Sequence, residues 1–365
     1  MILRPSKSIV IFVLCLLFIG LVCLYSSCHQ KGDFIKKDIF NKQLMWAGIG
    51  LCFMFLASRF DYHRWSIAVI PLYLFSFASL IFVLFMGRAI MGAQRWIDLG
   101  EISFQPSEVG KFALILLLAK YYSSKGVYEV SQSSSRVNIF KSLFAPLFFT
   151  MLLTCLVLVQ PDLGTAIVYL FVFLSIAFIA EIPLRYLLGL IGTGLVLMPF
   201  FWHFLKDYQK SRLLVFLNPN IDPLGAGYTV IQSKIAIGSG RLFGKGWLAG
   251  TQSQLNFLAE RHTDFIFSVL GEEWGFFGSI VLISLNFFLV FMILRVSEMA
   301  KDTFGRLLCI GIAALIFFHA FINIAMNAGL SPVVGLPLPF ISYGGSSLVI
   351  NLIGIGIVLN VARQR

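Results

Sequence analysis

Apolar residues are grouped along this chain into long runs that alternate with short polar segments. A membrane-spanning α-helix needs about 17–25 predominantly apolar residues. Runs close to this length predict nine spanning helices, at residues 8–26, 43–58, 66–86, 139–159, 163–180, 184–205, 274–295, 307–328 and 344–361. A tenth helix, at 105–122, is shorter and begins with the polar residues Gln105-Pro106-Ser107-Glu108. Proline at the first helical position with an acidic residue in the first turn is typical of a helix N-terminus.

The composition is that of a membrane protein. Of the 365 residues, 58% are apolar and 12% are charged, whereas about a quarter of the residues in an average protein are charged. So few charges are not enough to coat the surfaces of two or three soluble domains. The sequence therefore predicts an all-α polytopic membrane protein with about ten transmembrane helices, in which residues 1–365 form one domain.

Charge and motifs exclude several classes of function. The formal net charge is +11, but no run of basic residues forms a stripe that would bind nucleic acid. The six cysteines show no CxxC or other metal-ligand spacing, so neither disulfides nor zinc is indicated. The glycine-rich segment 238–246 has neither the spacing of a dinucleotide fingerprint nor that of a P-loop. No HExxH or GxSxG motif supports a protease or an esterase.

The distribution of basic residues predicts the topology. Ten spans place both termini on one side, and the terminal Arg4, Lys7, Arg363 and Arg365 indicate that this side is the cytoplasm. Four segments then lie outside, at 27–42, 87–104, 206–263 and 329–343. The long external loop at 206–263, between the seventh and eighth predicted helices, is conspicuous, because a structureless loop of that length is unusual unless it is functional.

Ionisable residues within the predicted helices are the first candidates for function, because each is costly in the bilayer. Glu108 and Lys111 lie three residues apart, on one helical face, where they can neutralise one another. They are either a structural ion pair or part of a site for a buried phosphate or hydroxyl. Asp162, in Gln160-Pro161-Asp162-Leu163-Gly164-Thr165, is better explained as the N-cap of the helix that follows than as a chemical group.

A second group of ionisable residues lies where the long loop meets the next span. Glu260, Arg261, His262, Asp264, Glu272 and Glu273 put six charged or titratable groups at this boundary. We expect Asp264 to open a helix and Glu272 to lie about 80° round it. Helix capping explains one acidic residue, but so many groups favour a functional site. His262 is either a general base or an interfacial residue without a chemical role.

Six segments together resemble the SEDS family of polytopic peptidoglycan polymerases. They are Gly92-Ala-Gln-Arg-Trp-Ile-Asp-Leu-Gly100, Gln105-Pro-Ser-Glu108 with Lys111, Gln160-Pro-Asp-Leu-Gly-Thr165, Tyr228 to Gly240, His262-Thr-Asp-Phe-Ile-Phe267 with Gly271-Glu-Glu-Trp-Gly275, and Pro337-Leu-Pro-Phe-Ile-Ser-Tyr-Gly-Gly-Ser-Ser347. They occur in family order from residue 90 onward. Arg261 before His-Thr-Asp and the segment Pro332-Val-Val-Gly335 are more similar to the elongation branch of the family than to the division branch.

The resemblance implies a glycosyltransferase that joins molecules of lipid II at the outer face of the bacterial cytoplasmic membrane. Forming a β-linkage from an α-linked pyrophosphate is an inversion, so a single displacement suffices. A carboxylate must take the proton of the acceptor hydroxyl, and cations must stabilise the leaving phosphate. Asp264 is the expected base.

The resemblance also implies substrate-binding residues and partners. Trp96, Glu108, Lys111 and Asp162 match family positions, and Glu272 belongs to the acidic group. Pyrophosphate contacts are expected from Arg95, Lys111, Arg212 and Lys234. The expected partners are lipid II, the growing glycan strand, the lipid bilayer and a class B penicillin-binding transpeptidase. The sequence identifies no cofactor, and it leaves open whether a divalent cation, Mg²⁺ or Mn²⁺, takes part. A lipid II flippase and a non-catalytic scaffold of the elongation machinery are the alternatives.

Overall fold

The computed structural model describes residues 5–28, 35–90, 93–99, 102–124, 136–225, 227–255 and 257–364. These residues form thirteen α-helices, and ten of them coincide with the ten predicted runs. The ten are α1 (Pro5–Cys28), α2 (Ile35–Arg59), α3 (Trp65–Met86), α4 (Pro106–Ser123), α6 (Arg136–Val159), α7 (Leu163–Ile179), α8 (Leu184–Phe201), α12 (Ile266–Glu298), α13 (Thr303–Asn327) and α14 (Gly345–Arg363). The predicted all-α polytopic fold is confirmed.

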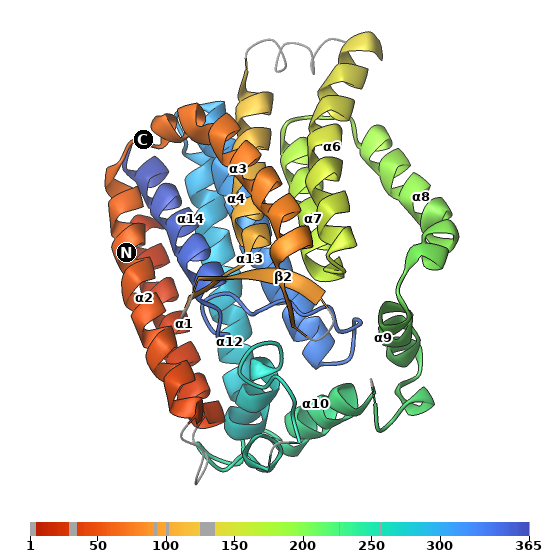
Figure 1. Cartoon of the computed structure of the whole chain (residues 1–365). Coiled ribbons are helices and arrows are strands. Elements are labelled where there is room, and N and C mark those ends of the chain that lie inside the picture. The colour runs from red at the N-terminus through yellow and green to blue at the C-terminus, as the bar shows by residue number, and fades with distance from the viewer. Residues whose placement is uncertain are drawn as a thin grey trace.

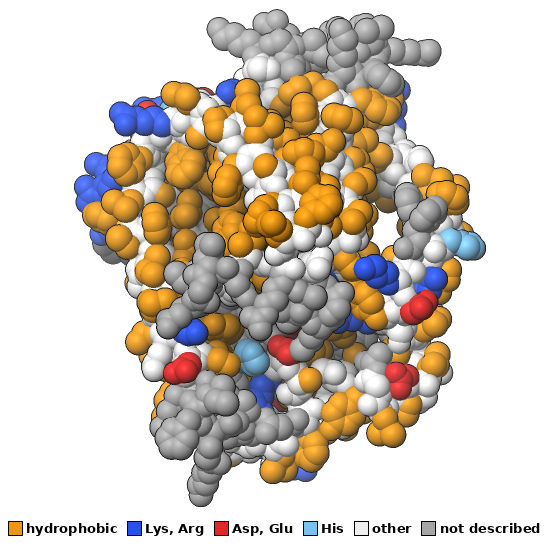
Figure 2. Space-filling model, in the orientation of Figure 1, with side chains coloured by type: hydrophobic (Ala, Val, Ile, Leu, Met, Phe, Trp, Pro, Cys, Tyr) orange, Lys and Arg blue, Asp and Glu red, His pale blue; other side chains and the backbone are white. Residues whose placement is uncertain are grey.

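The helices pack side by side into a bundle around α13. This helix contacts α4, α7, α12 and α14, and it lies at the centre of the bundle in Figure 1. Among the described helices, seven are long and apolar enough to cross a membrane, and α7 and α8 are shorter apolar helices. Figure 2 shows a broad band of apolar side chains across one face, with most charged side chains above and below it. The chain is a multi-pass membrane protein.

Local signals set two of the helix starts. Pro106 occupies the first turn of α4, as predicted. Asp162 is the N-cap of α7, where its carboxylate accepts hydrogen bonds from the backbone nitrogen of Thr165 at 3.2 Å and from the Thr165 hydroxyl at 2.9 Å. The first turn of a helix leaves its N–H groups unpaired, and Asp162 accepts a hydrogen bond from one of them, that of Thr165. The predicted capping role of Asp162 is therefore confirmed.

Three short strands lie between α3 and α4, where only a loop was predicted. They are β1 (Arg88–Ile90), β2 (Ala93–Leu99) and β3 (Ile102–Phe104), and they form an antiparallel sheet in that order. In this sheet Trp96 pairs with Arg88 and Ile97 with Phe104. β1 and β3 have three residues each, and the seven residues of β2 do not alternate between apolar and polar, which is why the sequence did not reveal the strands.

The helix predicted at 274–295 begins earlier, at Ile266. It is a longer helix, α12, with a break inside it. Its residues 266–274 and 276–298 are helical, and Gly275 between them has φ 67° and ψ −158°. The freed backbone groups are taken up by the preceding loop. The nitrogens of Phe276 and Phe277 donate to the carbonyls of Arg241 and Leu242, at 2.9 and 3.1 Å. The long loop thus completes the broken helix, as buried backbone groups require.

The long loop at 206–263 is not structureless. It contains α9 (Asp207–Leu217), α10 (Tyr228–Ser239) and the single turn α11 (Thr251–Gln254). In Figure 1, α9 lies at the lower right of the bundle and α10 lies along its lower edge, leading back towards α12, and α10 packs against α12 and α13. This segment is therefore a folded part of the domain.

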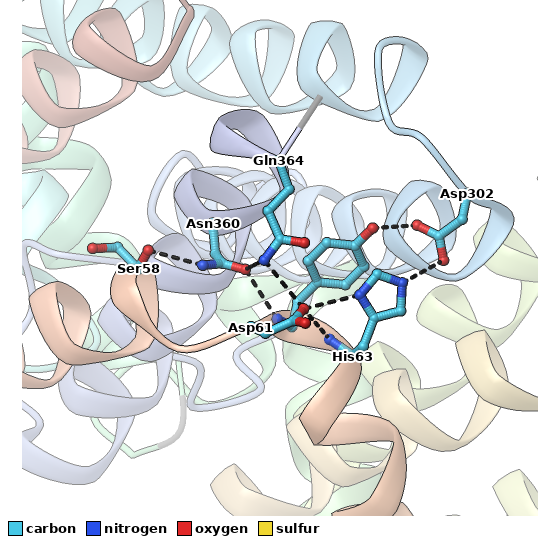
Figure 3. A network of polar contacts seen from close by, with 7 residues as sticks. Ser58, Asp61, His63, Asp302, Asn360 and Gln364 are labelled. Carbon is cyan, nitrogen blue, oxygen red and sulfur yellow. Dashed lines mark hydrogen bonds and ion pairs between the residues drawn. The ribbon is translucent and has the colours of Figure 1, made fainter.

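A polar network joins three chain segments at the end of α14 (Figure 3). The ring nitrogens of His63 lie 2.9 Å from an Asp61 oxygen and 3.5 Å from an Asp302 oxygen. Asn360 accepts from the backbone nitrogen of Tyr62 at 2.9 Å, and Gln364 donates to Asp61 at 3.1 Å. These contacts fix the α2–α3 and α12–α13 turns against the end of α14.

Candidate active site

A cavity of about 990 Å³ opens at the opposite end of α14, near its first residue. Its walls come from α2, β2, α9, the turn before α12 and the segment between α13 and α14. Sequence-distant elements therefore converge here, and four of the predicted site residues line the cavity: Arg95, Trp96, Arg212 and Asp264. The volume is in the range of small-molecule binding sites.

Asp264 lies on the cavity wall, half-buried, in a tight turn that ends at α12. The backbone nitrogens of Asp264 and Phe265 both donate to the carbonyl of Glu260, at 3.1 and 3.3 Å. Asp264 was expected to open a helix, but α12 begins two residues later, at Ile266. Its side chain is consequently presented by a turn and not by a helical face.

The surroundings of Asp264 raise the pKa of its carboxyl group to about 6. Burial is the main cause, and the negative charge of Glu260 adds to it, while the positive charges of Arg212 and Arg95 oppose it. A carboxylate with a pKa near neutrality is ionised at physiological pH and still accepts a proton readily. These are the properties of a general base.

The two arginines are held in place by backbone carbonyls. Arg95 donates from Nε to the carbonyl of Gln160 at 3.1 Å and from Nη2 to the carbonyl of Pro161, and its Nη1 lies 3.8 Å from Asp162. Arg212 donates to the carbonyl of Val333 at 3.2 Å and lies over the Tyr208 ring. Asp162 thus contributes to the site through Arg95 and does not line the cavity itself.

Glu272 and Lys234 are not brought to the cavity. Glu272 is fully buried and accepts from Lys245 at 2.7 Å, from Thr251 at 3.1 Å and from the nitrogen of Gln252 at 3.0 Å. It fastens the long loop to α12. Lys234 is exposed and borders a separate pocket of about 10 Å³ beside Arg212. The structure therefore separates both residues from Asp264.

Glu108 and Lys111 form a buried ion pair inside the bundle, 2.6 Å apart. Lys111 also lies 3.1 Å from Nε2 of His319 on α13. The pair joins α4 to α13, and neither residue lines the cavity. His319 could not be singled out from the sequence, because a lone histidine in an apolar run is not distinctive.

The sequence profile of the cell cycle proteins FtsW, RodA and SpoVE matches residues 7–365. The chain belongs to this family, the SEDS family. It is 39% identical over 369 residues to the peptidoglycan glycosyltransferase MrdB of Escherichia coli K12, covering 99% of this chain and 94% of that protein.

Two solved structures share the SEDS fold with this chain. One is a chain from work on the structural coordination of polymerization and crosslinking by a peptidoglycan synthase complex, with a TM-score of 0.81, 32% identity and coverage of 98% of this chain and 97% of that one. The other is the rod shape determining protein RodA of Thermus thermophilus, with a TM-score of 0.71, 30% identity and coverage of 98% and 96%.

Several cavity residues of this SEDS chain were not singled out from the sequence. Lys42 and Trp46 reach the cavity from α2, and Tyr208 from α9. Glu260 lies beside Asp264 in the same turn, and Tyr343 comes from the segment before α14. Tyr343 belongs to one of the segments that resemble the SEDS family, and Glu260 belongs to the group of titratable residues before α12. No spacing in the sequence marks the residues of α2.

The described residues offer little to a metal ion. No group of three or more His, Cys, Asp and Glu side chains among them is placed to hold one. Magnesium often binds through one or two carboxylates together with phosphate oxygens of a substrate. A cation at this site would therefore depend on oxygens from its ligand.

Proposed function

We propose that this chain is a peptidoglycan glycosyltransferase that polymerises lipid II into glycan strands, with Asp264 as the general base. The observation that carries the proposal is the half-buried Asp264 carboxylate on the wall of a large cavity, with a pKa raised to about 6 and with Arg95 and Arg212 on the same wall. A base and two cations around one space are what an inverting transfer from a pyrophosphate requires.

The reaction is a single displacement. The acceptor 4-hydroxyl loses its proton to Asp264 as its oxygen attacks the anomeric carbon of the donor sugar. The bond from that carbon to the pyrophosphate breaks, and undecaprenyl pyrophosphate leaves with the electron pair. Arg95 and Arg212 stabilise the negative charge that develops on the leaving group. A divalent cation, Mg²⁺ or Mn²⁺, bound to the pyrophosphate would add to this stabilisation, but no step depends on it.

The proposal includes a place in the cell. The active site faces the outside of the bacterial cytoplasmic membrane, with both termini in the cytoplasm, because the basic residues of the short loops favour that orientation. A class B penicillin-binding transpeptidase crosslinks the strands that this chain makes during cell elongation. The likeness to a chain of a peptidoglycan synthase complex supports such a partner.

The deciding experiment is polymerisation of lipid II by the purified protein, with and without a transpeptidase partner, and by Asp264→Asn. General-base assistance is worth about 10²–10⁴-fold, so this variant should lose at least about a hundredfold in rate while it still folds. Asp222→Asn is the matched control, because Asp222 lies in the same long loop and does not line the cavity. Near-normal polymerisation by Asp264→Asn would refute the assignment of the base. Transport of lipid II across vesicles without strand formation would favour a flippase.

A further inference from the structure

A row of buried polar side chains follows one face of α13, which is otherwise an apolar helix. His319, Asn323 and Asn327 stand four residues apart, so they lie on one face, and each is at most 1% exposed. Amides inside a membrane protein are costly unless their hydrogen bonds are satisfied. The partners of these two asparagines therefore indicate what the row does.

Asn327 bridges the first turn of α12. Its Nδ2 donates to the carbonyl oxygen of Asp264 at 2.9 Å, and its Oδ1 accepts from the backbone nitrogen of Ser268 at 3.2 Å and from the Ser268 hydroxyl at 2.6 Å. In a regular helix the nitrogen of Ser268 would donate to the carbonyl of Asp264. Here that nitrogen donates instead to the carbonyl of Phe265 at 3.1 Å and to Oδ1 of Asn327. The carbonyl of Asp264, which therefore lies outside the helical ladder, is bound by Nδ2 of Asn327.

Asn323 ties the same carbonyl to the opposite wall. Its Nδ2 donates to the carbonyl of Asp264 at 3.0 Å and to that of Leu336 at 2.7 Å. Leu336 follows Gly335, and a Cβ on Gly335 would lie only 3.5 Å from the carboxylate of Asp264. One amide thus fixes both the backbone of Asp264 and the segment that its carboxylate faces.

The two amides also brace one another. Nδ2 of Asn327 donates to the carbonyl of Asn323 at 2.8 Å. The carbonyl of Asn327 accepts from the hydroxyl of Ser233 on α10, which lies 2.6 Å from the hydroxyl of Ser268. The end of α13, α10 and the start of α12 are therefore joined at one point, directly behind Asp264.

We propose that Asn323 and Asn327 are positioning residues for Asp264. They hold its peptide group outside α12, so that the carboxylate keeps a fixed position on the cavity wall and is partly shielded from water. Neither residue lines the cavity, so they act through Asp264 and not on the substrate. The inference rests on the proposed function, in which Asp264 is the base.

The test uses the full-length protein with Asn323→Leu and Asn327→Leu, which remove the amide and keep a similar volume. Asn286→Leu is the matched control, because Asn286 is a buried amide of α12 whose Nδ2 donates to Leu282 of its own helix. Initial rates are measured against lipid II concentration from pH 4.5 to 8. Hydrogen exchange of the peptide covering residues 260–268 is measured in the same samples.

We expect Asn323→Leu and Asn327→Leu each to lower kcat at least about tenfold and to change KM less than about threefold. The acidic limb of the kcat profile should move to lower pH, because a loosened carboxylate gains water and its pKa falls towards the ordinary value. The variants leave in place the charged groups whose fields reach Asp264, which are Glu260 in its own turn, Arg212 on α9, Arg95 on β2 and Asp162 before α7. Exchange in residues 260–268 should accelerate at least about tenfold, whereas Asn286→Leu should change none of these.

Wild-type kcat, wild-type limb and wild-type exchange in both variants would overturn the proposal. A loss of rate that is the same at every pH, with the acidic limb and the hydrogen exchange of residues 260–268 unchanged, would also overturn it, because a smaller folded fraction has this effect. If Asn327→Leu does not fold, Asn323→Ala decides the same question, because it removes the bonds to Asp264 and Leu336 and the 3.3 Å bond from Nδ2 of Asn327, and leaves the bond from Asn327 to Asp264 in place. If Asp264→Asn keeps its activity, the proposed function fails, but hydrogen exchange still decides whether the asparagines hold the turn.

Discussion

The raised pKa of Asp264 predicts an acidic limit to the activity. With the ordinary pKa of 3.8, the Asp264 carboxyl would be ionised in more than about nine tenths of the molecules at pH 5. With the pKa of about 6 that burial produces here, about one tenth is ionised at pH 5 and about nine tenths at pH 7. Because only the ionised form accepts the proton, and kcat/KM follows the ionisation of the free enzyme, kcat/KM at pH 5 should be about a tenth of kcat/KM at pH 7.

The charges beside Asp264 allow the prediction to be tested in two directions, because removing one of them should raise the pKa of Asp264 and removing another should lower it. Arg212 lowers the pKa of Asp264 and Glu260 raises it. Arg212→Gln should therefore move the acidic limb to higher pH, and Glu260→Gln should move it to lower pH. Arg212→Gln should also lower the plateau, because it removes a cation from the leaving group, but the position of the limb is independent of the plateau.

The assay is kcat/KM for strand formation, obtained from initial rates at several lipid II concentrations, from pH 4.5 to 8. Lys234→Gln is the control, because it removes a positive charge from the same external loop at an exposed position outside the cavity. Its limb should coincide with that of the wild-type protein. Equal wild-type values of kcat/KM at pH 5 and pH 7, or limbs that move in the same direction in Arg212→Gln and Glu260→Gln, would refute the reasoning.

The remaining predictions concern the scaffold around the site. Lys111→Met leaves the buried Glu108 without its partner, which should cost about 3–5 kcal/mol of stability. Adding Glu108→Gln should restore the unfolding temperature. A double variant that folds but stays inactive would indicate a role beyond the ion pair. Gly275→Ala forces an alanine into a conformation that costs about 1–3 kcal/mol and places its Cβ 2.3 Å from a backbone nitrogen, so the unfolding temperature should fall clearly. Lys245→Met removes the cation from Glu272 and should release the loop, measured as faster limited proteolysis; unchanged cleavage would contradict the anchoring role of the pair.

The sequence by itself determined the helices. Within hydrocarbon every backbone group must be paired inside its own segment, so each long apolar run has to be helical wherever it packs. Pro106 and Asp162 act within one turn of chain, and their roles as first-turn proline and N-cap were predictable for the same reason. The motifs around Asp264 also sufficed to make it the candidate base, because the resemblance depends on residue types and order.

Only the tertiary structure decided which side chains meet Asp264. Arg95 and Arg212 reach the same cavity from β2 and α9, whereas Glu272, eight residues away in sequence, points to Lys245 instead. The sequence predicted that Asp264 opens a helix, but α12 begins at Ile266, and Asn327 on α13 donates to the carbonyl of Asp264 in the turn before it. Such contacts join elements far apart in the chain, and local spacing, which governs hydrogen bonds four residues apart, carries no record of them.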